Sequence, residues 1–195
     1  MQTVPIESIS PARLAALLTR ERAGRLGAEA QRARELLDGR VVWNVNATAS
    51  GGGVAEMLQS LLAYTRGAGI DARWVVLEGT PEFFRLTKRL HNLAHGTPGD
   101  GGPTGEAEHA TYDEVLAGNL TWLRERVSPG DLVLLHDPQT VGMAAGLRDT
   151  GAIVIWRCHI GLDTSNEHTD RAWAFLRPYA EQAEALIFSG DSFFQ

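Results

Sequence analysis

The sequence has little of several features that would assign it to a special class of protein. Its 195 residues include one cysteine, Cys158, which excludes an internal disulfide and suits a reducing compartment. Acidic residues outnumber basic ones, 24 against 18, and the formal charge of −6 argues against nonspecific binding to nucleic-acid phosphates. The chain begins without a basic segment followed by an apolar run, and no stretch reaches the ~18 apolar residues of a membrane helix. We therefore expect a cytoplasmic protein whose partners are small molecules, with no nucleic acid and no membrane among them.

What remains is the composition of an ordinary globular domain. The chain is 44% hydrophobic and 22% charged, and a domain of this length buries roughly 70% of the surface that its unfolded form exposes. Residues 1–39 are predicted to form an N-terminal helical extension. Pro11 after Ser10 is a helix start signal, and Gly39 is a stop signal, so residues 11–37 form one long helix or two broken ones. Residues 40–195 hold the main domain.

Short apolar runs dominate this domain. They comprise Val41–Trp43, Trp74–Leu77, Leu132–Leu135, Ile153–Trp156 and Ala185–Phe188. The runs lack alternation of apolar and polar residues, and helix-like segments separate them, which favours buried parallel strands over hairpins. The clearest of these helices spans 54–66 and carries one apolar stripe. The sequence thus predicts a Rossmann-like, doubly wound α/β fold.

Residues 96–106 read GTPGDGGPTGE, and their glycines and prolines oppose regular structure. We expect a mobile loop here. It is either a tolerant surface connection or a lid over a binding site.

Polar residues follow three of the predicted strands. They are Asn44 and Asn46 after the first strand, His136, Asp137 and Gln139 after the Leu132 strand, and Arg157 and His159 after the Ile153 strand. In open parallel sheets ligands bind beyond the carboxyl ends of the strands, where loops and helix N-termini converge. Each residue also has a purely structural explanation, since Asn46 could cap a turn and Asp137 could cap the next helix. Their convergence favours a ligand site.

The triple glycine Gly51–Gly53 opens the helix after the first strand. A dinucleotide fingerprint would require a further glycine at position 56, where this sequence has Glu56. Glu78 ends the second strand and could hold a ribose, so a nicotinamide-dependent oxidoreductase survives as a weaker hypothesis. The glycines are not a P-loop, because no Lys-Ser/Thr pair follows them. They suit the close approach of a ligand to bare backbone, or else form only a tight turn.

The sequence offers little support for a metal site, a cysteine nucleophile or a serine nucleophile. His91 and His95 are four residues apart on a predicted helix, yet Asn92 replaces the glutamate of a zinc motif, so a solvated helix face is favoured over a metal site. Cys158 and His159 point to opposite faces of a strand and cannot form a nucleophile and base pair, so Cys158 is predicted to lie in the core. No G-x-S-x-G elbow of a serine hydrolase occurs.

Taken in order, several motifs carry a family resemblance over about residues 40–190. The stretches WNVNATASGGGVAEMLQSLL, WVVLEGTPEFFRLTKRLHNLAHG, LLHDPQ, WRCHIGLD, WAFLRPY and ALIFS together resemble the N-terminal domain of trehalose synthase and trehalose phosphorylase, which are retaining glycosyltransferases of the GT-B fold. The resemblance implies two Rossmann-like domains facing each other across a cleft. The first domain mainly binds the acceptor sugar, and the second holds the nucleotide-sugar donor.

Because the sequence ends at Gln195, just past the fifth predicted strand, we expect it to hold only the acceptor-side domain. The missing C-terminal donor domain is then its main partner, and catalysis by this chain alone is not expected. Apolar surface left by the absent half could promote homo-oligomers. The resemblance implies no tightly bound cofactor. The donor, an NDP-glucose, is a substrate, and Mg²⁺ is compatible with the reaction but not required.

The resemblance also implies roles for individual residues. His159 is expected to hydrogen-bond a sugar hydroxyl near the anomeric centre, and together with Arg157 it forms the predicted catalytic set. The predicted substrate-binding residues are Asn46, Gly51, Gly52, Gly53, Glu56, His136, Asp137, Gln139 and Asp163. Front-face attack, in which the leaving phosphate takes the acceptor proton, requires no protein nucleophile. One departure concerns the residue after RCHI, where the family often has aspartate and this chain has Gly161, with Asp163 two places later.

The leading hypothesis is therefore the acceptor-side domain of a glucosyltransferase that forms trehalose or a similar α-glucoside. A phosphorylase of the same fold and a noncatalytic sugar-binding module are the alternatives, and the oxidoreductase ranks last.

Overall fold

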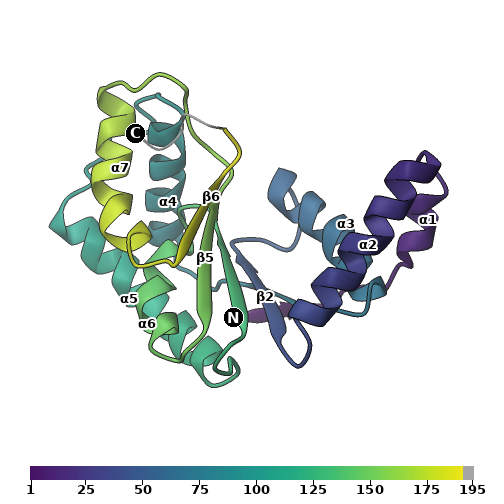
Figure 1. Ribbon diagram of the computed structural model, residues 1–195. Helices are drawn as coiled ribbons and strands as arrows, with labels where there is room; N and C mark the ends of the chain where they lie inside the picture. The colour runs from purple at the N-terminus through teal and green to yellow at the C-terminus, as the bar shows by residue number, and fades with distance from the viewer. Residues whose placement is uncertain (191–195) are drawn as a thin grey trace.

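The computed structural model describes residues 1–190 and is built on one mostly parallel sheet (Figure 1). Its strands are β1 (Gln2–Val4), β2 (Val41–Asn46), β3 (Asp71–Val76), β4 (Leu132–His136), β5 (Ile153–Cys158) and β6 (Ala185–Phe188). Its helices are α1 (Pro11–Ala15), α2 (Arg20–Leu36), α3 (Gly53–Gly67), α4 (Pro81–Ala94), α5 (Glu106–Arg124), α6 (Ala144–Arg148) and α7 (Glu167–Ala180), with a 3-10 turn η1 (Val141–Met143). The five predicted strands are confirmed as β2 to β6, and the helix predicted over 54–66 is α3.

The strand order, β1-β3-β2-β4-β5-β6, places a reversal of direction between β2 and β4. From β2 the chain first adds β3 on one side and then crosses over to add β4, β5 and β6 on the other. The loops after β2 and β4 therefore diverge and leave a crevice at the carboxyl ends of these two strands. In doubly wound sheets this switch point is where ligands bind.

The crossovers distribute the helices unequally over the two faces of the sheet. Helices α4, α5, α6 and α7 cover one face, whereas α3 packs on the other beside β3 (Figure 1). The larger core lies under the first group and includes Phe83, Leu123 and Trp156, and a smaller core beneath α3 includes Leu58 and Trp74. Right-handed crossovers made in opposite directions from β2 produce this division. The predicted doubly wound fold is confirmed.

The N-terminal segment is more than the helical extension that the sequence predicted. Residues 2–4 form β1, which pairs antiparallel with β3 at the edge of the sheet, Thr3 opposite Val75. The predicted helical region is indeed broken, because α2 begins afresh after Thr19, whose side chain accepts a hydrogen bond from the backbone N–H of Arg22. Helix α2 contains no buried residue, in agreement with the many charges in its sequence.

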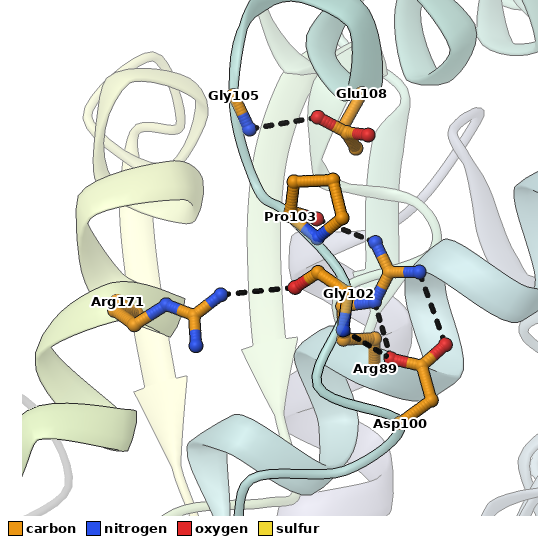
Figure 2. Close-up of polar contacts among 7 residues, drawn as sticks. All are labelled: Arg89, Asp100, Gly102, Pro103, Gly105, Glu108 and Arg171. Carbon is orange, nitrogen blue, oxygen red and sulfur yellow. Dashed lines mark hydrogen bonds and ion pairs between the residues drawn. The ribbon is translucent and has the colours of Figure 1, made fainter.

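The glycine- and proline-rich segment 96–105 is tied to the helices on both sides of it (Figure 2). Arg89 of α4 donates to Asp100 at 2.5 Å and to the carbonyl of Pro103, while Arg171 of α7 donates to the carbonyl of Gly102 at 3.0 Å. The Arg89 guanidinium lowers the pKa of Asp100 to about 2. The segment thus has defined anchors, and its mobility and its role as a lid stay predictions.

Candidate functional site

The turn after β2 presents bare backbone at the start of α3. Gly51 and Gly52 have φ values of 74° and 100°, a backbone conformation that residues with side chains rarely adopt. The space beside both glycines is open, because a Cβ added at either position would have no neighbouring atom within 4 Å. Gly52 is the N-cap of α3 and supplies no capping side chain, so the first N–H groups of a 15-residue helix remain open to a ligand. Asn46 supports the turn by donating from its amide to the carbonyl of Thr48 at 2.8 Å. The turn therefore suits an anion or a hydroxyl oxygen.

Asp137, directly after β4, adopts a left-handed backbone conformation with φ 63°. Its carbonyl accepts from the indole of Trp156 at 3.0 Å, and its carboxylate Oδ1 accepts from the backbone N–H of His159 at 2.8 Å. The carboxylate thus links the ends of β4 and β5 instead of capping a helix, the structural alternative considered above. Burial raises the pKa of Asp137 to about 6, although the His159 N–H and the Arg157 charge oppose the shift.

The two histidines beside Asp137 form a bonded pair. Nδ1 of His136 lies 3.0 Å from Nε2 of His159, and the rings are nearly parallel at an interplanar angle of 15°. Burial is the main cause that lowers the pKa of His136 to about 3 and that of His159 to about 4, and the positive charge of Arg157 adds to both shifts. Both imidazoles are therefore neutral at physiological pH.

The glycine turn, His136 and Asp137 border a cavity of about 420 Å³ at the switch point of the sheet. Its lining residues are Asn46, Ala47, Thr48, Gly51, Gly52, Gly53, Val54, Ala55, Lys88, His91, His136, Asp137 and Gln139. The volume falls within the roughly 300–1,000 Å³ of small-molecule sites. The structure thus brings together the glycine turn, Asn46 and the HDPQ motif.

Four predicted site residues lie outside this lining. His159 is not among the lining residues but is bonded to His136, which is one of them, and Arg157 holds a buried Nε with no hydrogen-bond partner among residues 1–190. Glu56 is exposed in the first turn of α3, and Asp163 is exposed in the loop after β5. Their assigned roles in substrate binding and catalysis stay predictions.

Helix α4 contributes two cavity residues that the sequence did not reveal. The prediction of a solvated helix face is wrong for His91, which is half-buried and lines the cavity next to Lys88. Burial, followed by the charge of Lys88, lowers the pKa of His91 to about 4. Lys88 is the only lysine of the chain. The local sequence does not predict that Lys88 and His91 line the cavity, because their placement depends on how α4 packs across the sheet.

Four further observations bear on the expectations stated above. Cys158 is fully buried, as predicted, and burial raises the pKa of its thiol. Glu78 pairs with the N-terminal amine at 3.2 Å and stays largely exposed. Within residues 1–190, no group of three or more potential ligands is placed to hold a metal ion. In the same part of the chain no helix is both long and apolar enough to cross a membrane.

An open, mostly parallel sheet with a crevice at its switch point defines the chain as a Rossmann-like domain, and its solved structural neighbours are glycosyltransferases of the GT-B architecture, which is built from two such domains. Solved structures agree on the fold. An α,α-trehalose-phosphate synthase (UDP-forming) from Burkholderia vietnamiensis superposes with a TM-score of 0.58 at 18% identity, over 80% of this chain and 40% of that one. A trehalose 6-phosphate synthase from Burkholderia multivorans gives 0.54 at 17% identity, over 79% of this chain and 41% of that one.

The sequence comparisons identify the family. The family model described as "Trehalose synthase, N-terminal domain" matches residues 44–195, so the chain belongs to that family. The trehalose synthase of Pyrococcus horikoshii is 38% identical over 158 residues, which are 81% of this chain and 36% of that protein. The trehalose synthase of Rubrobacter xylanophilus is 36% identical over 173 residues, 87% of this chain and 40% of that protein. The chain thus spans well under half the length of these relatives.

A more distant relative carries a different name. The trehalose phosphorylase of Pleurotus pulmonarius is 29% identical over 154 residues, 73% of this chain and 21% of that protein.

Proposed function

We propose that this chain is the acceptor-side domain of a retaining glycosyltransferase that transfers glucose from a nucleotide-glucose donor to glucose or a related sugar, forming trehalose or a similar α-glucoside. The supporting observation is the cavity between the glycine turn and the HDPQ motif. Its walls carry the neutral imidazole of His136, the amides of Asn46 and Gln139, and the largely buried carboxyl of Asp137. Such groups suit the hydroxyls of a sugar, which both donate and accept hydrogen bonds.

The two sides of the cavity would then serve different parts of the reaction. The carboxylate of Asp137 is a strong acceptor for an acceptor-sugar hydroxyl. The open N–H groups of α3 and the ammonium of Lys88 would face the donor diphosphate, where negative charge develops as the glycosidic bond to the leaving group breaks. No protein nucleophile is needed if the leaving phosphate takes the proton of the attacking hydroxyl.

A chimera tests this proposal. Residues 1–195 would replace the matching first domain of the Rubrobacter xylanophilus trehalose synthase, and the product would be assayed with glucose and with uridine, adenosine or guanosine diphosphate glucose. We expect trehalose from at least one donor. The unsubstituted enzyme is the positive control, and its C-terminal part alone is the negative control. Absence of product, together with no calorimetric binding of glucose or trehalose to the chain itself, would refute the proposal.

A phosphorylase is the second candidate, and the similarity to the Pleurotus pulmonarius protein favours it. Lys88 is compatible with either function, because inorganic phosphate and a diphosphate are both anions. The same chimera separates the two functions when it is assayed for phosphate-dependent cleavage of trehalose. Cleavage without any nucleotide-dependent synthesis would assign the phosphorylase function.

A further inference from the structure

A buried asparagine touches the histidine pair from behind the cavity. Asn44 of β2 is 2% exposed, and its Oδ1 lies 3.2 Å from Nε2 of His136. Its Nδ2 is buried with no hydrogen-bond partner among the described residues. A buried donor left without a partner destabilises the folded state. An apolar residue at this position would avoid the destabilisation. The presence of asparagine therefore indicates that its other polar atom, the Oδ1 that contacts His136, has a role.

The hydrogen bonds of this cluster dictate where each imidazole carries its hydrogen. A neutral imidazole has one N–H and one lone pair, whereas an amide oxygen can only accept. Facing Oδ1 of Asn44, His136 must therefore carry its hydrogen on Nε2. Its Nδ1 is then a lone pair, so Nε2 of His159, 3.0 Å away, must be the donor. The Nδ1 atom of His159 is left as a lone pair, and it has no hydrogen-bond partner among residues 1–190.

The surroundings keep this chain of hydrogen bonds in the neutral state. His136 is 1% exposed, and the charge of Arg157 disfavours an added proton on either ring. The carboxylate of Asp137 meanwhile holds the backbone N–H of His159 at 2.8 Å. Asp137 thus determines the position of His159. Asn44, acting through His136, determines which ring nitrogen of His159 carries the hydrogen.

We propose that Asn44 is a positioning residue which, acting through His136, fixes His159 as the Nε2–H tautomer and so presents its Nδ1 to a sugar hydroxyl as a hydrogen-bond acceptor. The part that concerns the sugar rests on the proposed function, whereas the tautomers do not. An acceptor at this point selects for a ligand group that can donate a hydrogen bond. Turning the Asn44 amide by 180° would place Nδ2 against His136 and reverse both tautomers, so the two arrangements make opposite predictions.

Two-bond ¹⁵N–¹H correlation spectra of the ¹⁵N-labelled chain at pH 7.5 distinguish them directly. We expect His136 and His159 both to be Nε2–H tautomers. Nδ1–H tautomers in both rings, or an exchange-averaged mixture, would overturn the proposal. This measurement needs no variant, so it decides the matter even if substitutions at position 44 prevent folding.

Variants then test the positioning role. Asn44→Leu removes the acceptor and should leave His159 in a mixture of tautomers, whereas Asn44→Asp keeps an acceptor and should preserve the wild-type tautomer. Asn119→Leu is the matched control, because Asn119 is also buried but bonds the backbone of Glu78 and Val115. It should lower stability without changing either tautomer.

Sugar binding separates this proposal from the proposed function. We expect glucose affinity to fall about tenfold in Asn44→Leu, the loss of roughly one hydrogen bond, and to be largely retained in Asn44→Asp. Unchanged affinity in an Asn44→Leu protein whose His159 tautomer has become mixed would refute the positioning role. If the expected tautomers are found but no sugar binds even the wild-type chain, Asn44 still sets the tautomer and the proposed function fails.

Discussion

At the scale of single residues, Asp137 combines constraints that seldom coincide. It has a left-handed backbone, a carboxylate bonded to the next strand, and a pKa raised to about 6 by burial. Asparagine and aspartate tolerate this backbone better than other residues with side chains, because their short polar groups bond locally. The strain and the partial burial of charge are both costs, which is typical of a functional position.

Asp137→Asn separates the charge from the conformation. The amide can keep the left-handed backbone and still accept from the His159 N–H, but it loses the charge-assisted bond to a sugar. We expect glucose affinity to fall about tenfold with little change in melting temperature, whereas Asp137→Ala should lose affinity and stability together. Calorimetry and thermal melts measure the two effects. Asp149→Asn, at an exposed aspartate outside the cavity, is the control, and an equal loss of affinity there would contradict the assignment.

The sequence predicts which residues form this site better than it predicts how they are arranged in space. Asn46, the three glycines and the HDPQ residues could be found because all of them lie at or just after the ends of strands, and the carboxyl ends of parallel strands share an edge. Lys88 and His91 were missed because they enter from the middle of a helix, where spacing does not reveal which side faces a cavity. The His136–Asn44 contact was missed because it joins side chains 92 positions apart.

At the scale of elements, the sequence predicted the strands and helices that carry a long hydrophobic pattern and missed the strand whose pattern is short. Strands β2 to β6 and helix α3 each carry a run or stripe of apolar residues. Strand β1 has only three residues, and its pairing with β3 is a tertiary event that no local pattern encodes. The glycine-rich segment 96–105 was predicted from its composition alone, which gives no sign that Arg89 and Arg171 hold it from two helices.

Arg89→Ala should release this segment. We expect faster proteolysis and faster amide exchange within residues 96–105, with a loss of only about 1 kcal/mol in global stability, since the partner Asp100 is half exposed. Arg85→Ala is the matched control on the same helix, because Arg85 makes an exposed ion pair with Glu82. Equal proteolysis of the two variants would show that Arg89 does not anchor the segment.

At the scale of the whole molecule, stability should depend on pH through buried neutral histidines. The pKa values of His91, His136 and His159 are lowered from 6.5 to about 4, 3 and 4. Below pH 6.5 the unfolded chain therefore binds protons that the folded chain refuses, and stability falls as the pH drops toward 4. Asp137, with its pKa raised from 3.8 to about 6, acts in the opposite sense between those values. The three histidines together have a larger effect on stability than the single aspartate, so the net effect of lowering the pH is destabilisation.

We expect the urea midpoint of the chain to fall steadily from pH 7 to pH 4.5. His91→Gln should reduce the slope, because it removes one of the three histidines while leaving the pair beside Asp137 intact. A midpoint that is constant or rises over this range would mean that the histidines are solvated in the folded protein.

The tryptophans give the molecule a set of intrinsic reporters for ligand binding. The indole N–H of Trp74 donates to Asn46 and that of Trp156 to Asp137, so two walls of the cavity each carry an indole resonance. Trp43 donates instead to Asp131, at the opposite end of the strands, and supplies an internal reference. A sugar titration of the unmodified chain can thus be followed on three indole signals. The pattern of shifts would reveal which wall the sugar touches.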